Sequence, residues 1–314
     1  MGPRKRLVLV FLLLSIAALA QQIPDFNVTY PFHFMVYGDT RFTDSTHRDA
    51  SDPDFRRAIV GQVAKEKPDF LVLTGDLVGT GSSDADWQVL DHETEVWRQA
   101  GIHVFPVLGN HDTSGASQYF SRFPDVRNRP WYAVRTGNCY FIMLNSNVNS
   151  PDSQQWKWLV QQLENVPQGV QYLFVVQHHP ALTRSSDRMP GGGHSVRPVD
   201  ERLASLVEER QKRLKIPVIV LAGHVHNYER YLRDGVMYVT TGGGGATPHE
   251  IPRDPADPYP SPGPTYSYCR VTVDRNSLAF QMVKVSIAEG KPSFTVADSF
   301  QFGQGRAKAG AASH

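Results

Sequence analysis

Cysteine is scarce in this 314-residue sequence, which contains only Cys139 and Cys269. Two cysteines alone do not make a thiolate metal site, and neither lies beside a histidine as a catalytic pair would. The sequence also lacks the nucleophile elbow of serine hydrolases. Both cysteines lie in strand-like runs, which leaves two interpretations open: a disulfide, which export would permit, or two buried small apolar side chains.

Acidic and basic residues are almost balanced, and the formal net charge is only +1. Residues 1–20 contain three basic and no acidic side chains, so removing them changes the net charge to −2. A chain this close to neutrality presents no evident face for a polyanion. We therefore expect no stable nucleic-acid partner.

Long apolar runs are absent except at residues 7–19, which follow Arg4, Lys5 and Arg6. The small residues Ala18 and Ala20 suit a signal peptidase, so residues 1–20 are interpreted as a cleaved secretory signal. The alternative is a retained membrane anchor, although the run is shorter than the roughly 20 residues that span a bilayer. We expect a secreted or periplasmic protein that leaves the membrane when the signal is removed.

No internal repeat and no linker divides the rest of the chain, which predicts one domain over residues 21–302 and a disordered tail over 303–314. The sequence does not indicate an oligomeric state. Apolar periodicity predicts alternating strands and helices. The expected strands are 32–37, 70–73, 102–108, 131–135, 139–144, 172–176, 217–221, 236–240, 266–273, 278–285 and 294–297, and the expected helices are 53–67, 86–100, one beginning after Ser153, and 199–214.

Five of the strand-like runs end in polar side chains that can bind metal. Open α/β sheets place their chemistry at such strand ends, so carboxylates, imidazoles and an amide arriving there predict a metal site assembled from loops. His224 and His226 are two residues apart and share one site only if the backbone turns after Gly223. The five segments are Gly38-Asp39, Gly75-Asp76, Gly109-Asn110-His111-Asp112, Gln177-His178-His179-Pro180 and Gly223-His224-Val225-His226.

In this order the five segments resemble the signature of the calcineurin-like metallophosphoesterases. Residues 223–230 and 154–159 are similar to the purple acid phosphatase branch in particular, and the resemblance runs from about residue 32 to 285. It implies an α/β fold, a four-layer α/β/β/α sandwich of two mixed β-sheets flanked by helices. It also implies a hydrolase of phosphomonoesters or phosphodiesters whose partner is a small-molecule phosphoester. The expected signal at residues 1–20 would export this hydrolase.

The resemblance further implies two divalent or trivalent ions, of manganese, iron or zinc, bridged by Asp76. A hydroxide between them would attack phosphorus in line, while His111 stabilises the transition state or protonates the departing oxygen. Asp112 would orient that imidazole, or cap the loop instead. The implied ligands are Asp39, Asp76 and His226 for the first metal, and Asp76, Asn110, His178 and His224 for the second.

Two positions depart from the family pattern, because Arg41 and Gly79 stand where relatives have a histidine and a tyrosine ligand. A guanidinium cannot ligate a metal, but it can grip a phosphate or pair with a carboxylate. Arg41 is therefore predicted either to bind the substrate phosphate during catalysis or to form a salt bridge. His47 is a weaker candidate for the missing ligand. The lost ligands also favour an alternative function, a metal-binding exported protein with weak or no catalysis.

Substrate contacts are expected from Arg41 and Asn110, and from two further histidines that follow the strand at 172–176, His179 and His194. Arg184 and Arg197 lie in the same loop region and have either a substrate-binding or a solvated, structural role.

Overall fold

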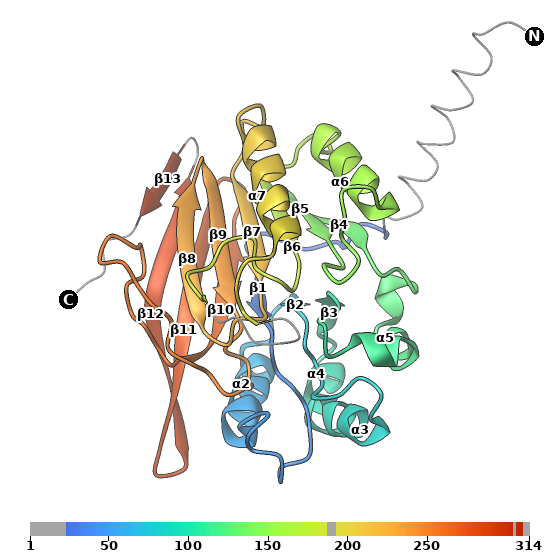
Figure 1. Cartoon of the computed structure of the whole chain (residues 1–314), viewed down its shortest axis with the longest axis vertical. Coiled ribbons are helices and arrows are strands. Elements are labelled where there is room, and N and C mark those ends of the chain that lie inside the picture. The colour runs from blue at the N-terminus through green and yellow to red at the C-terminus, as the bar shows by residue number, and fades with distance from the viewer. Residues whose placement is uncertain (1–22, 187–192, 304–305, 310–314) are drawn as a thin grey trace, which may run out of the picture.

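The computed structural model describes residues 23–186, 193–303 and 306–309, so the expected signal segment lies outside the described residues. Within these ranges two mixed β-sheets face each other, with helices on the outer side of each (Figure 1). This is the predicted α/β/β/α sandwich. None of the described helices is both long enough and apolar enough to cross a bilayer.

The first sheet has the strand order β13-β12-β11-β10-β1-β2-β3. Strands β1, β2 and β3 run parallel, and the other strands add antiparallel neighbours. Its strands are β1 (Phe32–Tyr37), β2 (Phe70–Leu73), β3 (His103–Pro106), β10 (Tyr266–Val273), β11 (Leu278–Ala288), β12 (Lys291–Gly303) and β13 (Arg306–Ala309).

The second sheet has the order β4-β5-β6-β7-β9-β8, with β5, β6, β7 and β9 parallel and an antiparallel strand at each edge. Its strands are β4 (Tyr132–Thr136), β5 (Cys139–Met143), β6 (Tyr172–Val176), β7 (Val218–Ala222), β8 (Tyr228–Arg233) and β9 (Val236–Thr241). The helices are α2 (Pro53–Glu66), α3 (Asp84–Glu93), α4 (Glu95–Gln99), α5 (Ala116–Arg122), α6 (Gln154–Glu164) and α7 (Pro198–Gln211), with 3-10 turns at Thr113–Gly115 and Pro124–Val126.

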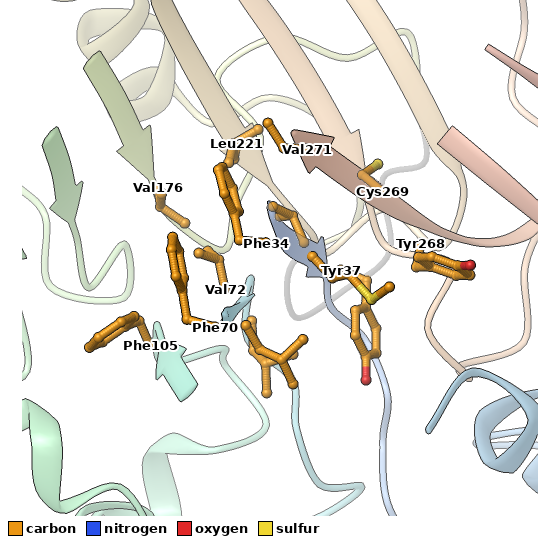
Figure 2. Close-up of a cluster of buried hydrophobic side chains, with 14 of the residues drawn as sticks. Phe34, Tyr37, Phe70, Val72, Phe105, Val176, Leu221, Tyr268, Cys269 and Val271 are labelled. Carbon is orange, nitrogen blue, oxygen red and sulfur yellow. The ribbon is translucent and has the colours of Figure 1, made fainter. Parts of the chain in front are cut away.

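The two sheets are held together by an aromatic core between them (Figure 2). Phe34 and Phe70 stack at 4.8 Å in the first sheet, and Phe141 and Phe174 stack at 4.5 Å in the second. Phe34 meets Phe141 edge to face at 5.3 Å, so the pairs interlock across the interface. A second core fills the space between the six-stranded sheet and the helices α6 and α7. This packing holds the strands, and therefore the loops at their ends, in fixed positions.

Local signals in the sequence correctly located the starts of two helices. The Asp52 side chain accepts hydrogen bonds from the backbone N–H groups of Asp54 and Phe55, and Pro53 is the first residue of α2, as the sequence predicted. Ser153 likewise caps α6 by accepting from the backbone N–H of Trp156.

Several elements differ from the prediction. The helix expected over 86–100 is two helices that meet at Thr94, whose hydroxyl donates to the carbonyl of Leu90. This bond competes with the regular helical pattern. Strand β8 was not predicted, and β12 extends well beyond the expected 294–297. Residues 306–309, in the segment expected to be disordered, pair with β12 as β13.

Cys139 and Cys269 are both buried and free. The interpretation as small apolar core residues is therefore confirmed, and the disulfide alternative is wrong. Cys139 belongs to the six-stranded sheet and Cys269 to the seven-stranded sheet, where Figure 2 shows it beside Val271 and Tyr268.

Candidate metal centre

The loops after β1, β2, β3, β6 and β7 converge, because they follow the carboxyl ends of the parallel strands of both sheets. The chain turns sharply there: Asp39, Asp76 and His224 all have positive φ, at 56°, 52° and 68°. Close approach also requires glycine, because a Cβ on Gly109 would lie 2.1 Å from the Asp76 backbone nitrogen. The positive φ at His224 shows that the backbone turns after Gly223, which is the condition for His224 and His226 to share one site.

Three of the predicted ligands, Asp76, His178 and His224, have ligand atoms within 4.8 Å of one another. His178 Nε2 lies 3.3 Å from Asp76 Oδ1 and 3.2 Å from His224 Nδ1. Asn110 Oδ1 joins this group at 3.0 Å from His178 Nε2. The described residues therefore place all four predicted ligands of the second metal together.

The tautomer of His178 suits metal binding. Its Nδ1 donates to the backbone carbonyl of Thr74 at 2.8 Å, and a carbonyl can only accept, so Nδ1 carries the proton. The lone pair of Nε2 then faces the oxygens of Asp76 and Asn110, which are themselves acceptors. Electron-rich nitrogen and oxygen atoms that face one another in a buried position fit a cation of the manganese, iron or zinc class.

Asp39 and His226 form a second group of predicted ligands. Asp39 Oδ1 and His226 Nε2 are 3.7 Å apart, both are buried, and neither has a hydrogen-bond partner within the described part of the chain. His226 Nδ1 donates to the carbonyl of Thr247 at 3.1 Å, so Nε2 presents its lone pair to the carboxylate. These residues fit the first metal position, although they supply fewer ligands than the other group.

Burial shapes the charges of these groups. Burial, and next the carboxylate of Asp76, raise the pKa of Asp39 well above its usual value. Burial alone would also raise the pKa of Asp76, but the electrostatic effect of its neighbours His178, His111 and Arg41 outweighs burial and lowers that pKa. Burial lowers the pKa values of the ligand histidines, so they stay neutral and able to bind metal.

Arg41 forms the predicted salt bridge. Its Nη2 lies 3.3 Å from Asp76 Oδ2 and 2.9 Å from His111 Nε2, and its side chain is 17% exposed. The carboxylate partner is Asp76 itself, the residue expected to bridge the metals. A grip on the substrate phosphate stays a prediction.

His111 is oriented by a backbone group that the sequence analysis did not identify. Its Nδ1 donates to the carbonyl of Gly79 at 2.7 Å, and its Nε2 accepts from Arg41. In this arrangement Nε2 carries no proton to give to a leaving group. Stabilising the transition state and donating a proton both require a proton on Nε2, so both roles of His111 stay predictions.

Asp112 hydrogen-bonds to backbone groups rather than to the ring of His111, whose Nδ1 is held by Gly79, and a catalytic role for Asp112 stays a prediction. Its carboxylate accepts from the backbone N–H groups of Gly109 and Leu77, both at 2.9 Å, and of Val78 at 3.3 Å. It therefore caps and ties together the loops that carry Asp76 and Asn110, which is the alternative that the sequence left open. Burial and the charge of Asp76 raise the pKa of Asp112 to about 8.

The two further histidines predicted to contact substrate, His179 and His194, both lie near His224. His179 lies in the centre, with its ring 4.3 Å from that of His224 and its Nδ1 2.8 Å from Ser146 Oγ. The ring centroid of His194 lies 5.2 Å from that of His224 and 5.1 Å from that of His226. His194 also stacks on His249 at 4.7 Å. His249 thus joins the site from the loop after β9.

The remaining candidates are His47, Arg184 and Arg197, and a substrate-binding role for the two arginines stays a prediction. His47 is exposed and contacts Thr43, so it does not complete the ligand set. The ion pair of Arg184 is with Asp257, and that of Arg197 is with Asp200, each at 2.6 Å. Both pairs anchor the loop region on either side of residues 187–192.

The buried histidines predict how the stability of the metal-free protein depends on pH. Below about pH 6.5 the unfolded chain binds protons on histidines that the folded protein keeps neutral, so stability falls as pH is lowered. Four histidines of the centre have lowered pKa values: His178, His179, His224 and His226. We expect the melting temperature in chelator to rise between about pH 5 and about pH 6.5.

Asp39 and Asp112 have the opposite effect at higher pH, because the folded protein keeps protons that the unfolded chain loses near pH 4. The melting temperature in chelator should therefore fall again from about pH 7 to about pH 9. Added Mn²⁺ should reduce this fall, because a cation bound at Asp76 favours the ionised form of the carboxylates near it. A melting temperature in chelator that keeps rising to pH 9 would contradict the raised pKa values.

The chain is similar to known phosphoesterases. A family model described as calcineurin-like phosphoesterase matches residues 32–228. Purple acid phosphatase 21 of Arabidopsis thaliana is 26% identical over 239 residues, which cover 69% of this chain and 50% of that protein. The chain spans about half or less of the length of the curated relatives it matches.

Solved structures share the fold. Purple acid phosphatase PPD1 from yellow lupin (Lupinus luteus) seeds matches with a TM-score of 0.67 and 18% identity, over 88% of this chain and 54% of that one. A dimetal phosphatase from Danio rerio matches with a TM-score of 0.58 and 15% identity, over 85% of this chain and 99% of that one.

Proposed function

We propose that this chain, which belongs to the calcineurin-like phosphoesterase family, is an exported hydrolase that cleaves phosphomonoesters or phosphodiesters at a metal centre built around Asp76. One observation carries the proposal: the ligand atoms of Asp76, His178 and His224 lie within 4.8 Å of one another, and Asn110 joins them. That oxygen and nitrogen set matches what a phosphate-binding metal requires.

The residues present would hold metal in two positions that share Asp76. Asp76, Asn110, His178 and His224 would hold one ion, and Asp39, Asp76 and His226 the other. Bound ions of manganese, iron or zinc would supply Lewis acidity to phosphoryl oxygens and lower the pKa of a nucleophilic water.

Substrate approach is limited to one side of the centre. Asp39, Asp76 and His178 are completely buried, whereas Asn110 is exposed and the side chain of His111 is 32% exposed. Arg41 lies beside His111 on this open side. A phosphoester entering here would meet the amide of Asn110 and the guanidinium of Arg41, which suit phosphoryl oxygens. His179 and His194 would contact the substrate from the adjoining loops.

A second candidate function is a metal-binding exported protein with weak or no catalysis. The specific observation in its favour is the ion pair between Arg41 and Asp76, which places a fixed cation at one oxygen of the shared ligand. The two candidates differ in turnover rather than in metal content.

Hydrolysis of para-nitrophenyl phosphate and of its bis ester tests the proposal. We expect turnover with added Mn²⁺, loss of turnover in chelator, and recovery when metal is returned, because metal supplies the nucleophile. Bound metal without turnover of either ester would favour the second candidate. Turnover that survives removal of all metal would contradict the proposed function.

A further inference from the structure

The two oxygens of Asp76 face two different cation positions. Oδ1 lies 3.3 Å from His178 Nε2, on the side of the three-residue group, while Oδ2 lies 3.3 Å from Arg41 Nη2. Asp76 is completely buried, so its charge is poorly screened by water. A carboxylate in this environment needs a nearby positive charge, and on the Oδ2 side the chain already supplies one.

Arg41 is held where it can act as that charge. Its backbone has φ of 42°, its N–H donates to the carbonyl of Asp76, and its Nη2 also donates to His111 Nε2. The guanidinium is therefore fixed by the turn after β1 and by two side chains of the centre. It stays protonated, so it adds positive charge without offering a lone pair to a metal.

The position formed by Asp39 and His226 depends on the same carboxylate. Asp39 Oδ1 and His226 Nε2 provide only two ligand atoms of their own, so a metal there would need Asp76 as a third. Within the described residues, one group of three carboxylates or imidazoles meets the mutual distances for a metal, and it contains neither of these two. An ion at this position would also experience repulsion from the guanidinium beside Asp76.

We propose that the guanidinium of Arg41 competes with a second metal ion for the carboxylate of Asp76, so that the chain binds one metal ion tightly and a second one much more weakly. The tight ion belongs to Asp76, Asn110, His178 and His224, and the weak one to Asp39 and His226. This inference rests on the proposed metal centre, and it concerns how many ions are bound rather than whether the centre hydrolyses esters.

Metal stoichiometry tests the inference directly. The protein is loaded with Mn²⁺, desalted, and analysed for metal per chain, and a Mn²⁺ titration of chelator-treated protein then measures the weaker affinity. We expect about one retained ion in the wild type. Arg41→His removes the competing charge and adds an imidazole, so it should tighten the second ion by about tenfold or more and bring retention close to two ions.

Three further variants separate the causes. Arg41→Ala removes the charge without adding a ligand, so it should tighten the second ion less than Arg41→His does. Arg41→Lys keeps the charge and should leave retention at one. Arg57→Ala removes an arginine that is 52% exposed and paired with Glu93, so its metal content should match the wild type. Melting temperatures verify that each variant is folded.

The results also separate this inference from the proposed function. Two tightly retained ions in the wild type, or a second affinity unchanged in both Arg41→His and Arg41→Ala, would overturn the competition. A wild type that retains no ion and hydrolyses neither ester would instead overturn the metal centre itself. One retained ion that becomes two in Arg41→His supports the inference whatever the rate of hydrolysis.

Discussion

Replacing Asp76 by asparagine is expected to lower kcat/KM for para-nitrophenyl phosphate by about 10³-fold or more, since metal ligation is worth several kcal/mol in such reactions. The amide keeps the shape of the side chain but removes the negative charge that both metal positions share. It also leaves the guanidinium of Arg41 without its carboxylate partner 3.3 Å away. Metal retained after desalting should fall together with the rate.

Asp298→Asn is the matched control. Asp298 is also largely buried and pairs with an arginine, Arg230 at 2.6 Å, but it lies in β12 and its side chain accepts hydrogen bonds from Arg230 and Tyr228. It should leave metal content and kcat/KM close to wild type, with any cost confined to stability. If Asp76→Asn and Asp298→Asn had equal effects on the rate, Asp76 would not be the shared ligand.

Replacing His178 by alanine is expected to weaken the tightest Mn²⁺ affinity by about 10²-fold or more, because even residues that only support a ligand account for 10- to 100-fold. His178 Nε2 is the atom that lies near Asp76, Asn110 and His224 together. Turnover at limiting Mn²⁺ should fall in proportion, and excess Mn²⁺ should restore part of it.

His92→Ala controls for the loss of an imidazole as such. His92 is exposed on α3, away from the strand ends that build the centre, so its removal should change neither Mn²⁺ affinity nor turnover. An Mn²⁺ affinity that is unchanged in His178→Ala would show that the metal is bound elsewhere.

Features that depend on short stretches of chain could be predicted from the sequence. Asp52 and Pro53 start α2 because a capping carboxylate and a fixed φ act within one turn. The convergence of the candidate ligands could be predicted for a related reason: each follows a buried strand, and parallel strands bring their carboxyl ends to one edge. The choice of His178 over its neighbour agrees with the structure, which places His178 Nε2 against Asp76 Oδ1.

Contacts between backbone and distant side chains could not be predicted in this way. The carbonyl of Gly79 orients His111, and the N–H groups of Gly109 and Leu77 occupy Asp112, although sequence proximity suggested that Asp112 would hold its neighbour. Every residue carries the same carbonyl and N–H, so no residue type marks which of them will be used.

The sequence by itself indicated the strand ends and the types of candidate ligand, through apolar patterning and side-chain chemistry, and it indicated the sandwich fold through its resemblance to a known family. Only the tertiary structure decided that the carboxylate partner of Arg41 is Asp76 and that its guanidinium also contacts His111. That pairing joins residues 35 and 70 positions apart, and it exists because the loops after β1, β2 and β3 meet where three parallel strands end.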